Sequence, residues 1–462
     1  MQIKRLGWIT LVALAIGVMP HTTRAADKTD KDLEERVRAL EKKLDQTQKG
    51  VVTEQKGMLD RVDAIEKEVK DNEKTLLDKT GISVHAMVAM DYLYDINAPA
   101  GTPVGSFSQP FLRSFENEKN SFILNLGNLH FERAADNLPG FVLDFDFGKT
   151  ADVVNNSTYF GRHATDPNNP SANIPITGNG TDFFDARQFY LTYTVPVGSG
   201  IKLKAGRFVT LAGAEVIKSY NSFNYNVTNS ILFGFAIPFT HTGLMASYAF
   251  TDQVSLDMGL VNGWDAVSDN NDGKSLHSGL TLAFDPHITF YQTVTYGPEQ
   301  TGHTLADSAG NTLVVHAGRS KRLLLTSLIT IKPIDPLTLI IDYDYGNDSD
   351  SQPHTLPTGV FADGLLHTAQ WQGAAGYIIY NFTDDLSACL RGEVFDDVDG
   401  ARTGARATYT EVTPTLTYKI TDGLWWRNEY RHDESDTKKV FAHDTALIRG
   451  QDTIATELIY AF

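Results

Sequence analysis

Apolar and polar residues alternate along the chain from residue 82 to its last residue. In the first such stretch, Ile82, Val84 and Val88 share one parity, whereas Ser83 and His85 share the other. A period of two residues is typical of a β-strand whose two faces meet different surroundings. The pattern recurs in about 16 segments, which we predict to be strands: 82–94, 120–133, 140–148, 183–195, 201–208, 242–250, 253–263, 276–284, 287–297, 321–332, 336–346, 368–382, 385–396, 405–420, 423–432 and 452–462.

The connections between these segments alternate in length. Those after the odd-numbered strands are mostly long, and those after the even-numbered strands are tight turns built from Gly, Pro, Asp and Thr, such as 251–252 and 421–423. A soluble β-sandwich would also alternate, but it would not sort its loops by length to one end. We therefore predict an all-β fold, a closed transmembrane antiparallel barrel of about 16 strands in the outer membrane of a Gram-negative bacterium.

The first 80 residues have a different composition. Lys4 and Arg5 precede a short apolar run, and Thr23-Arg24-Ala25 follows it, which predicts a signal peptide at 1–25 rather than an anchor helix. Residues 26–80 are rich in Glu, Lys, Asp and Gln. Apolar residues recur there at heptad spacing: Leu33, Val37, Leu40, Leu44, Met58, Val62, Ile65, Val69 and Leu76. We predict a periplasmic α-helical coiled coil, with a single solvated helix as the alternative. An exposed seam favours a homo-oligomer, and we expect a trimer, although dimer and trimer are not separated by these residues.

Between two predicted strands lies a stretch, Gly206–Gly243, in which the alternation stops. It is rich in Asn, Phe, Tyr and small residues, and its charges are Arg207, Glu215 and Lys218. Loops of this length are usually functional or disordered, and this one is too apolar for a disordered linker. We predict that the loop near 209–241 folds into the barrel and narrows it. The alternative is that it packs outside the barrel or against a neighbouring subunit.

The same stretch carries a family resemblance. The sequences Gly206-Arg207-Phe208, Gly213-Ala214-Glu215, 221–225 (NSFNY) and 238–243 (PFTHTG) resemble the signature of the OmpL-like, "porin-2" group of bacterial outer-membrane β-barrel porins, as does 261–265 (VNGWD). The resemblance covers 82–462 and implies a passive channel. It implies no particular solute, and the charged helix at 26–80 is not part of it.

Composition and motifs exclude other classes of protein. The formal net charge of −17 argues against nucleic acid as a partner, because phosphate binding needs a basic surface. The single Cys389 excludes an internal disulfide. No G-x-S-x-G motif is present, and 268–279 lacks the ligand pattern of a calcium loop. His241, His277, His367 and His432 have no metal spacing. We therefore expect no enzymatic activity, no cofactor and no metal.

Strand parity identifies candidate pore-lining charges. We predict that they face the lumen together with the two charges of the long loop: Lys202, Lys204, Glu215, Lys218, Asp144, Asp146, Arg391, Glu393, Arg427, Glu429 and Arg431, with Asp257, Asp342 and Asp344 on the same face. Glu215 and Lys218 should face wall charges such as Lys202, Lys204, Arg427 and Arg431. Each charge could instead form a structural ion pair that braces the wall. Parity slips between Leu126 and Leu129, which suggests a bulge and leaves Arg187 and Arg207 unassigned.

These observations predict an outer-membrane porin, a water-filled channel for passive diffusion of ions and small hydrophilic solutes, with membrane lipid around it. Two alternatives remain open. The barrel could be a plug that is tethered to the periplasm by the coiled coil, or it could be an outer-membrane hydrolase with Ser and His on an outer strand face.

Overall fold

The computed structural model describes residues 35, 38–46, 61, 67, 80–97, 112–116, 118–134, 138–157, 183–300, 302–316, 319–355, 361–436, 440–443 and 446–462. The chain forms two units, 1–80 and 81–462. In the first unit, residues 38–46 are helical. The predicted signal peptide and most of the predicted coiled-coil seam lie outside the described residues. No helix among the described residues is long and apolar enough to cross a membrane.

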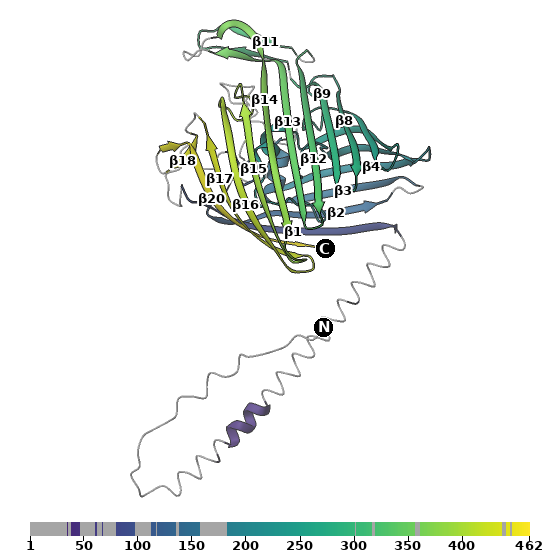
Figure 1. Cartoon of the computed structure of the whole chain (residues 1–462), viewed down its shortest axis with the longest axis vertical. Coiled ribbons are helices and arrows are strands. Elements are labelled where there is room, and N and C mark those ends of the chain that lie inside the picture. Colours follow the sequence, from purple (N-terminus) through teal and green to yellow (C-terminus); the bar gives the residue numbers. More distant parts are fainter. Residues whose placement is uncertain are drawn as a thin grey trace. The chain divides into compact units, whose positions relative to one another are not determined.

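The second unit is a closed antiparallel barrel of 16 strands (Figure 1). Each strand pairs with its neighbour in sequence, and β1 closes the ring by pairing with β20. The barrel strands are β1 (Ile82–Asp95), β2 (Ser121–Arg133), β3 (Gly140–Phe147), β4 (Phe184–Val195), β5 (Ile201–Val209), β6 (Thr240–Ala249), β7 (Val254–Val261), β8 (Ser275–Asp285), β9 (Ile288–Pro298), β12 (Lys321–Ile334), β13 (Leu337–Thr355), β14 (Phe361–Asn381), β15 (Leu386–Asp397), β16 (Ala407–Thr421), β17 (Leu424–Ser435) and β20 (Gly450–Ala461). The predicted barrel and strand number are confirmed.

The connections contain further elements that the alternation did not predict. Helix α2 (Lys149–Ser157) follows β3, and a π-helical turn, η1 (Leu232–Ala236), lies between β5 and β6. Two hairpins, β10 (His303–Ala306) with β11 (Thr312–Val315) and β18 (Phe441–His443) with β19 (Ala446–Ile448), form separate small sheets. β13 and β14 are also longer than predicted at the end that carries the long loops. The extension of β13, residues 347–355, is polar, because backbone pairing in water needs no apolar face.

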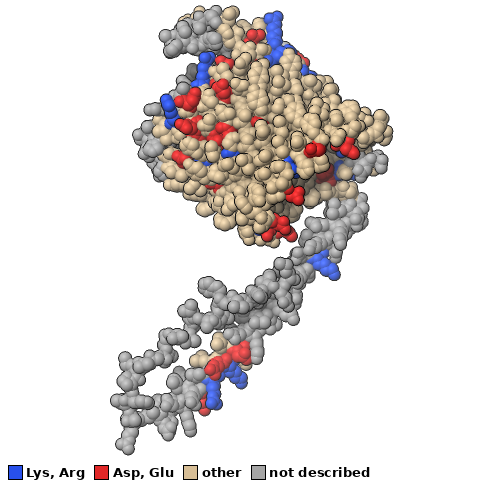
Figure 2. All heavy atoms as spheres, viewed as in Figure 1, with Lys and Arg blue, Asp and Glu red and all other residues tan. Residues whose placement is uncertain are grey.

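The outward faces of the strands are apolar and exposed. Leu244 and Leu260 are 66% and 60% exposed, on neighbouring strands β6 and β7. In the view of Figure 2, the barrel surface that faces the viewer includes a broad area with few charged residues. Aromatic residues lie near strand ends on the outward faces, among them Phe250, Phe284, Tyr380, Phe382, Tyr418, Tyr460 and Phe462. An apolar band with aromatic rims is what a bilayer requires of a barrel.

The expected break in parity on β2 is a β-bulge. Ala89 pairs with Leu126 and Met90 pairs with Leu124, so Asn125 is an extra residue in β2. Asn125 and Leu126 are both buried, whereas Leu124 and Leu129 are exposed on the outward face. The bulge therefore turns Leu126 inward, and strict alternation resumes after it.

Candidate functional site

The segment 210–239, which connects β5 to β6, bonds to strands that are far apart in the barrel. The Ala214 amide donates to Asp342 of β13 at 2.7 Å. Arg187 of β4 donates to the Lys218 carbonyl oxygen at 2.6 Å, and Lys218 forms an ion pair with Glu457 of β20 at 2.8 Å. These strands are the fourth, eleventh and sixteenth of the ring, so a segment that contacts all three reaches across it.

The tip of this segment is a tight turn that contacts a further part of the wall. Ser219 and Ser222 exchange two backbone hydrogen bonds, of 2.6 and 3.1 Å. Between them, the Tyr220 ring stacks on His85 of β1, with ring centroids 4.3 Å apart and planes at 2°. His130 of β2 lies 4.7 Å from the same ring. Aromatic stacking thus adds a fourth region of the wall to the contacts of the segment.

The part of the segment after the turn is held by carboxylates. Six consecutive backbone amides, from Val227 to Leu232, each donate a hydrogen bond to a Glu side chain. The acceptors are Glu429 for residues 227 and 228, Glu116 for 229, Glu215 for 230, and Glu393 for 231 and 232. A buried amide without a partner is costly, and this row of acceptors provides a partner for each amide from 227 to 232.

Basic side chains bind the carbonyl oxygens of the same stretch. Arg427 donates to the carbonyls of Asn224 and Asn226, at 2.5 and 3.1 Å. The remaining donors are Lys218 to the carbonyl of Val227, Arg391 to that of Thr228 and Arg431 to that of Asn229. Backbone donors and acceptors are therefore both satisfied by acidic and basic side chains, which come from the wall, from the connection after β1 and from the segment itself.

These side chains form a network of ion pairs in two groups, one around Arg391 and Arg431 and one around Arg427. Arg391 bridges Glu215 and Glu411, each at 2.6 Å. Arg431 contacts Glu411 and Asp433, each at 2.8 Å, and Arg427 pairs with Glu457. Replacing one member of a buried pair typically costs about 3–5 kcal/mol, because its partner remains charged and unpaired. The network therefore fixes the position of the segment more than it adds net stability.

The end of the segment, where it joins β6, is also fixed. Asp265 accepts hydrogen bonds from the amides of Phe239 and Thr240, at 2.7 and 2.8 Å. Trp371 of β14 donates to the Ala236 carbonyl at 3.1 Å, and Arg402 donates to that of Phe235 at 2.5 Å. The neighbouring connections and β14 thus clamp the π-helical turn.

Burial shifts the pKa of several groups that lie in the connections. Burial is the largest cause of the raised pKa of Glu116, although nearby Arg113 and Lys218 oppose it. Burial, together with Arg431, lowers the pKa of Arg113. Burial also raises the pKa of Asp265 to about 7, although the hydrogen bonds that it accepts from two backbone amides oppose this rise. The carboxylate of Asp265 is therefore partly protonated near neutral pH.

The structure places the predicted pore-lining charges in three environments. Arg391, Arg427 and Arg431 are fully buried, and Glu393 and Glu429 are 6% and 3% exposed. All five bond to the segment 210–239 and are buried, so they do not form a free water-facing surface. The reason is that this segment covers them.

The predicted partners of Glu215 and Lys218 were wrong in detail. These residues pair with Arg391 and Glu457, not with Lys202 or Lys204. Lys202 is exposed, whereas the half-buried ammonium of Lys204 lies 4.7 Å from the Tyr190 ring centroid and 5.3 Å from that of Phe208. A lysine on aromatic faces gains a cation–π interaction and does not need an acidic partner.

Asp144 and Asp146 are buried on β3, beside an arginine whose orientation strand parity did not predict. Arg187 lies 3.5 Å from Asp144 and 3.4 Å from Asp146. Arg207, which parity also left unassigned, pairs with Asp185 at 2.8 Å. Both arginines are therefore inside the barrel and act as braces of its wall.

Several residues of the site were missed at the sequence level. Glu411 and Glu457 share the parity of the inward residues on their strands and could have been found that way. Glu116 and Arg113 lie in the connection after β1, where no periodic signal exists. Among the described residues, no group of three or more His, Cys, Asp or Glu side chains is arranged to bind a metal.

Several solved structures and one family model are similar to this chain. A search of curated proteins found no match. Similar solved structures include the outer membrane channel DcaP of Acinetobacter baumannii, at 12% identity over 82% of this chain and 97% of that chain, with a TM-score of 0.48. OmpT of Vibrio cholerae has 11% identity over 82% and 97%, with a TM-score of 0.47. An anion-selective porin from Comamonas acidovorans has 8% identity over 82% and 99%, with a TM-score of 0.49.

The match with one family model covers the whole barrel unit. The model described as "Putative beta-barrel porin-2, OmpL-like" matches residues 81–462, which is well over half of the chain. Residues 1–80 lie outside that match. This protein therefore belongs to the OmpL-like beta-barrel porin-2 family and is an outer-membrane porin, a channel for passive diffusion.

Proposed function

We propose that the segment 210–239 folds into the lumen of this diffusion channel and forms its narrowest point. The observation that carries this proposal is the row of six consecutive backbone amides bound to Glu side chains. A chain held this way cannot swing aside without exposing several buried charges. The channel therefore has a fixed size limit for ions and small hydrophilic solutes. We propose no catalytic step for any residue.

Liposome swelling tests this size limit. Purified protein is reconstituted into liposomes, and the swelling rate is measured with uncharged sugars of increasing mass. A sharp fall in rate with sugar size supports a fixed constriction. Equal rates for small and large sugars would contradict it, and no swelling with any solute would contradict a diffusion channel.

We also propose that the protein forms a homotrimer through its periplasmic helix. The apolar heptad seam in residues 26–80 supports this proposal, because an uncovered seam would be exposed to water. Native mass measurement of the full chain and of a variant lacking 26–80 tests it. Trimers for the full chain and a weakened assembly for the shortened one are expected, and a monomeric full chain would refute it.

A further inference from the structure

The connection after β1 contains a short buried stretch, residues 112–116, which we call the strap. Leu112, Arg113, Phe115 and Glu116 are each no more than 6% exposed. A connection that runs over the surface would leave its charged side chains in water, and such side chains are rarely buried without partners. Both charged residues of the strap are buried, so the strap packs against other parts of the chain.

The two charges of the strap both act on one residue of the segment 210–239, Asn229. Glu116 accepts a hydrogen bond from the Asn229 amide at 3.1 Å, and in the row of six amides it is the acceptor that comes from neither the wall nor the segment itself. Arg113 forms an ion pair with Asp433 of β17 at 2.8 Å. Asp433 also holds Arg431, which donates to the Asn229 carbonyl. The strap therefore holds Asn229 directly at its amide and indirectly at its carbonyl.

The middle of the strap packs on the π-helical turn η1 and the residues after it. The Phe115 ring centroid lies 5.5 Å from that of Phe233 and 5.2 Å from that of Phe239. Aromatic rings at these distances attract one another in addition to the effect of their burial. The Ser114 hydroxyl donates to the Gly234 carbonyl at 3.1 Å. A Cβ on Gly234 would lie 3.2 Å from the Cβ of Ser114 and would overlap its Oγ, so this close approach depends on a glycine in the turn.

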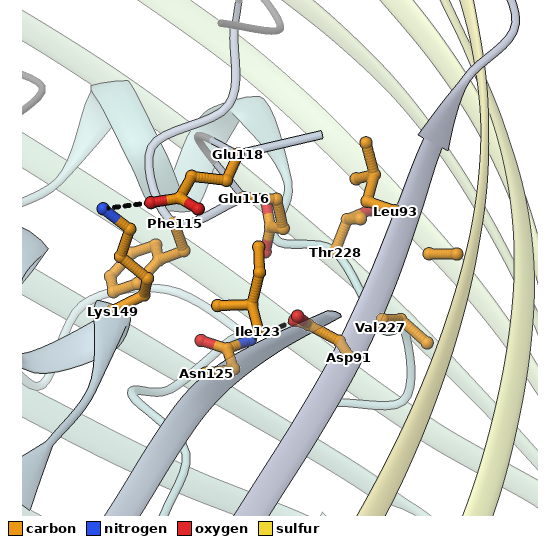
Figure 3. A pocket seen from close by; sticks show the side chains of 11 residues that line it. Asp91, Leu93, Phe115, Glu116, Glu118, Ile123, Asn125, Lys149, Val227 and Thr228 are labelled. Atoms are coloured by element: carbon orange, nitrogen blue, oxygen red, sulfur yellow. Dashed lines mark hydrogen bonds and ion pairs between the residues drawn. The ribbon is translucent and has the colours of Figure 1, made fainter. Parts of the chain in front are cut away.

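A cavity beside the strap shows that the strap is not tightly packed on every side (Figure 3). The cavity lies between the strap, β1, β2 and the segment 210–239, and its empty volume is about 320 Å³, including the space at its mouth. Phe115 and Glu116 line it from the strap, and Val227 and Thr228 line it from the segment. The position of the strap is therefore fixed by its bonds to Asn229 and its contacts with η1 more than by packing all around it.

We propose that the strap is a second element of the constriction, which locks the segment 210–239 in its narrow position. The inference rests on the proposed role of this segment and adds the residues that hold it in place. Arg113, Phe115 and Glu116 are positioning residues, because they act through the segment and not on the solute. When the strap is released, Asn229 and η1 lose these contacts, the segment moves away from its narrow position more often, and larger solutes pass.

Liposome swelling with a monosaccharide and a disaccharide measures the effect of releasing the strap in the full-length protein. Phe115→Ala removes the ring that packs on Phe233 and Phe239, and the control Phe250→Ala makes the same change at an exposed position just after β6. The ratio of the disaccharide rate to the monosaccharide rate should rise by about twofold or more in Phe115→Ala and stay unchanged in the control. An unchanged ratio in a folded Phe115→Ala barrel would overturn the inference. A wild-type protein that passes neither sugar would instead contradict the diffusion function, and one that passes both at equal rates would contradict the constriction.

A disulfide that ties the strap to η1 separates positioning from a general loss of structure. Ser114→Cys and Gly234→Cys are added to Phe115→Ala, at Cβ positions 3.2 Å apart, which is near the separation of about 3.5–4.5 Å in disulfides. The reduced protein should show the raised ratio of Phe115→Ala, oxidation should return the ratio to the wild-type value, and a reductant should raise it again. Mass spectrometry detects the crosslink, and heat-dependent migration on a gel identifies folded barrels.

Two results of this experiment would overturn the inference. The first is a crosslinked protein with the same ratio as its reduced form, and the second is a folded barrel in which the crosslink does not form. If Phe115→Ala does not fold, Arg113→Gln takes its place in both experiments, because it removes the ion pair with Asp433 and leaves the ring of Phe115 in position.

Discussion

The Glu429 carboxylate is the most heavily used anchor of the segment 210–239. Its two oxygens accept four hydrogen bonds: from the amides of Val227 and Thr228, and from the hydroxyls of Thr228 and Thr415. In Glu429→Gln one carboxylate oxygen becomes an NH₂ group. This group donates hydrogen bonds, and the groups that face it are donors too. The threonine hydroxyls can rotate to accept from it, but a backbone amide cannot.

The expected cost of Glu429→Gln follows from this count. One buried amide loses its acceptor, at about 1–3 kcal/mol, and the remaining bonds lose the strength that a charged acceptor gives. We therefore expect the free energy of local opening of the segment to fall by about 3 kcal/mol, while the barrel stays folded. At about 1.4 kcal/mol per factor of ten, amides 227–232 should exchange roughly 100-fold faster.

Hydrogen–deuterium exchange with mass spectrometry measures this effect directly. The matched control is Glu434→Gln, which makes the same chemical change on the outward, exposed side of the same strand. Fast exchange at 227–232 in Glu429→Gln alone is the expected result. Unchanged exchange there would refute the view that Glu429 holds the segment, and loss of the folded barrel would show that it acts on the wall instead.

Three further outcomes follow from the structure. Gly206→Ala should destabilise the barrel by about 1–3 kcal/mol, because Gly206 has φ +137° and a Cβ there would lie 2.2 Å from the Phe189 carbonyl oxygen. Urea unfolding measures this loss of stability, and the control is Gly376→Ala, whose Cβ meets nothing closer than 4.0 Å. Leu260→Arg should cost about 2–4 kcal/mol in refolding into lipid, since the side chain is exposed on the outward face, and Leu260→Met should be neutral. Burial raises the pKa of Asp265 to about 7, so the stability that it contributes is complete below about pH 4 and is lost as pH rises through 7. Asp265→Asn, which keeps the accepting oxygen, should remove this fall in thermal stability between pH 4 and 8, and an identical pH profile in both proteins would refute the assignment.

The barrel was predictable from sequence because its cause is local. Each strand must present an apolar face to lipid, so apolar and polar residues alternate in the sequence of each strand, as in 254–261 and 386–397. The polar extension of β13 and the bulge at Asn125 were harder, since the first lacks an apolar face and the second shows only as a change of phase.

The site was predictable in residue type but not in pairing. Parity predicted Arg391, Glu393, Arg427, Glu429 and Arg431 as inward residues, and all five are buried. Parity cannot say that a segment about 200 residues earlier in the chain will cover them, as in the bond between Val227 and Glu429. Glu116 has no periodic signal at all, because it reaches Asn229 from a connection instead of a strand.

Single-channel conductance tests the central claim, that the segment 210–239 sets the narrowest point of the pore. Residues 216–225, which form the turn, are replaced by two glycines, and the anchored stretch 226–232 is kept. The control removes the β10–β11 hairpin from an outer connection. Conductance should rise by about twofold or more in the first variant, because it grows with the open cross-section, and should stay unchanged in the control. A folded barrel with unchanged conductance after removal of 216–225 would contradict the account.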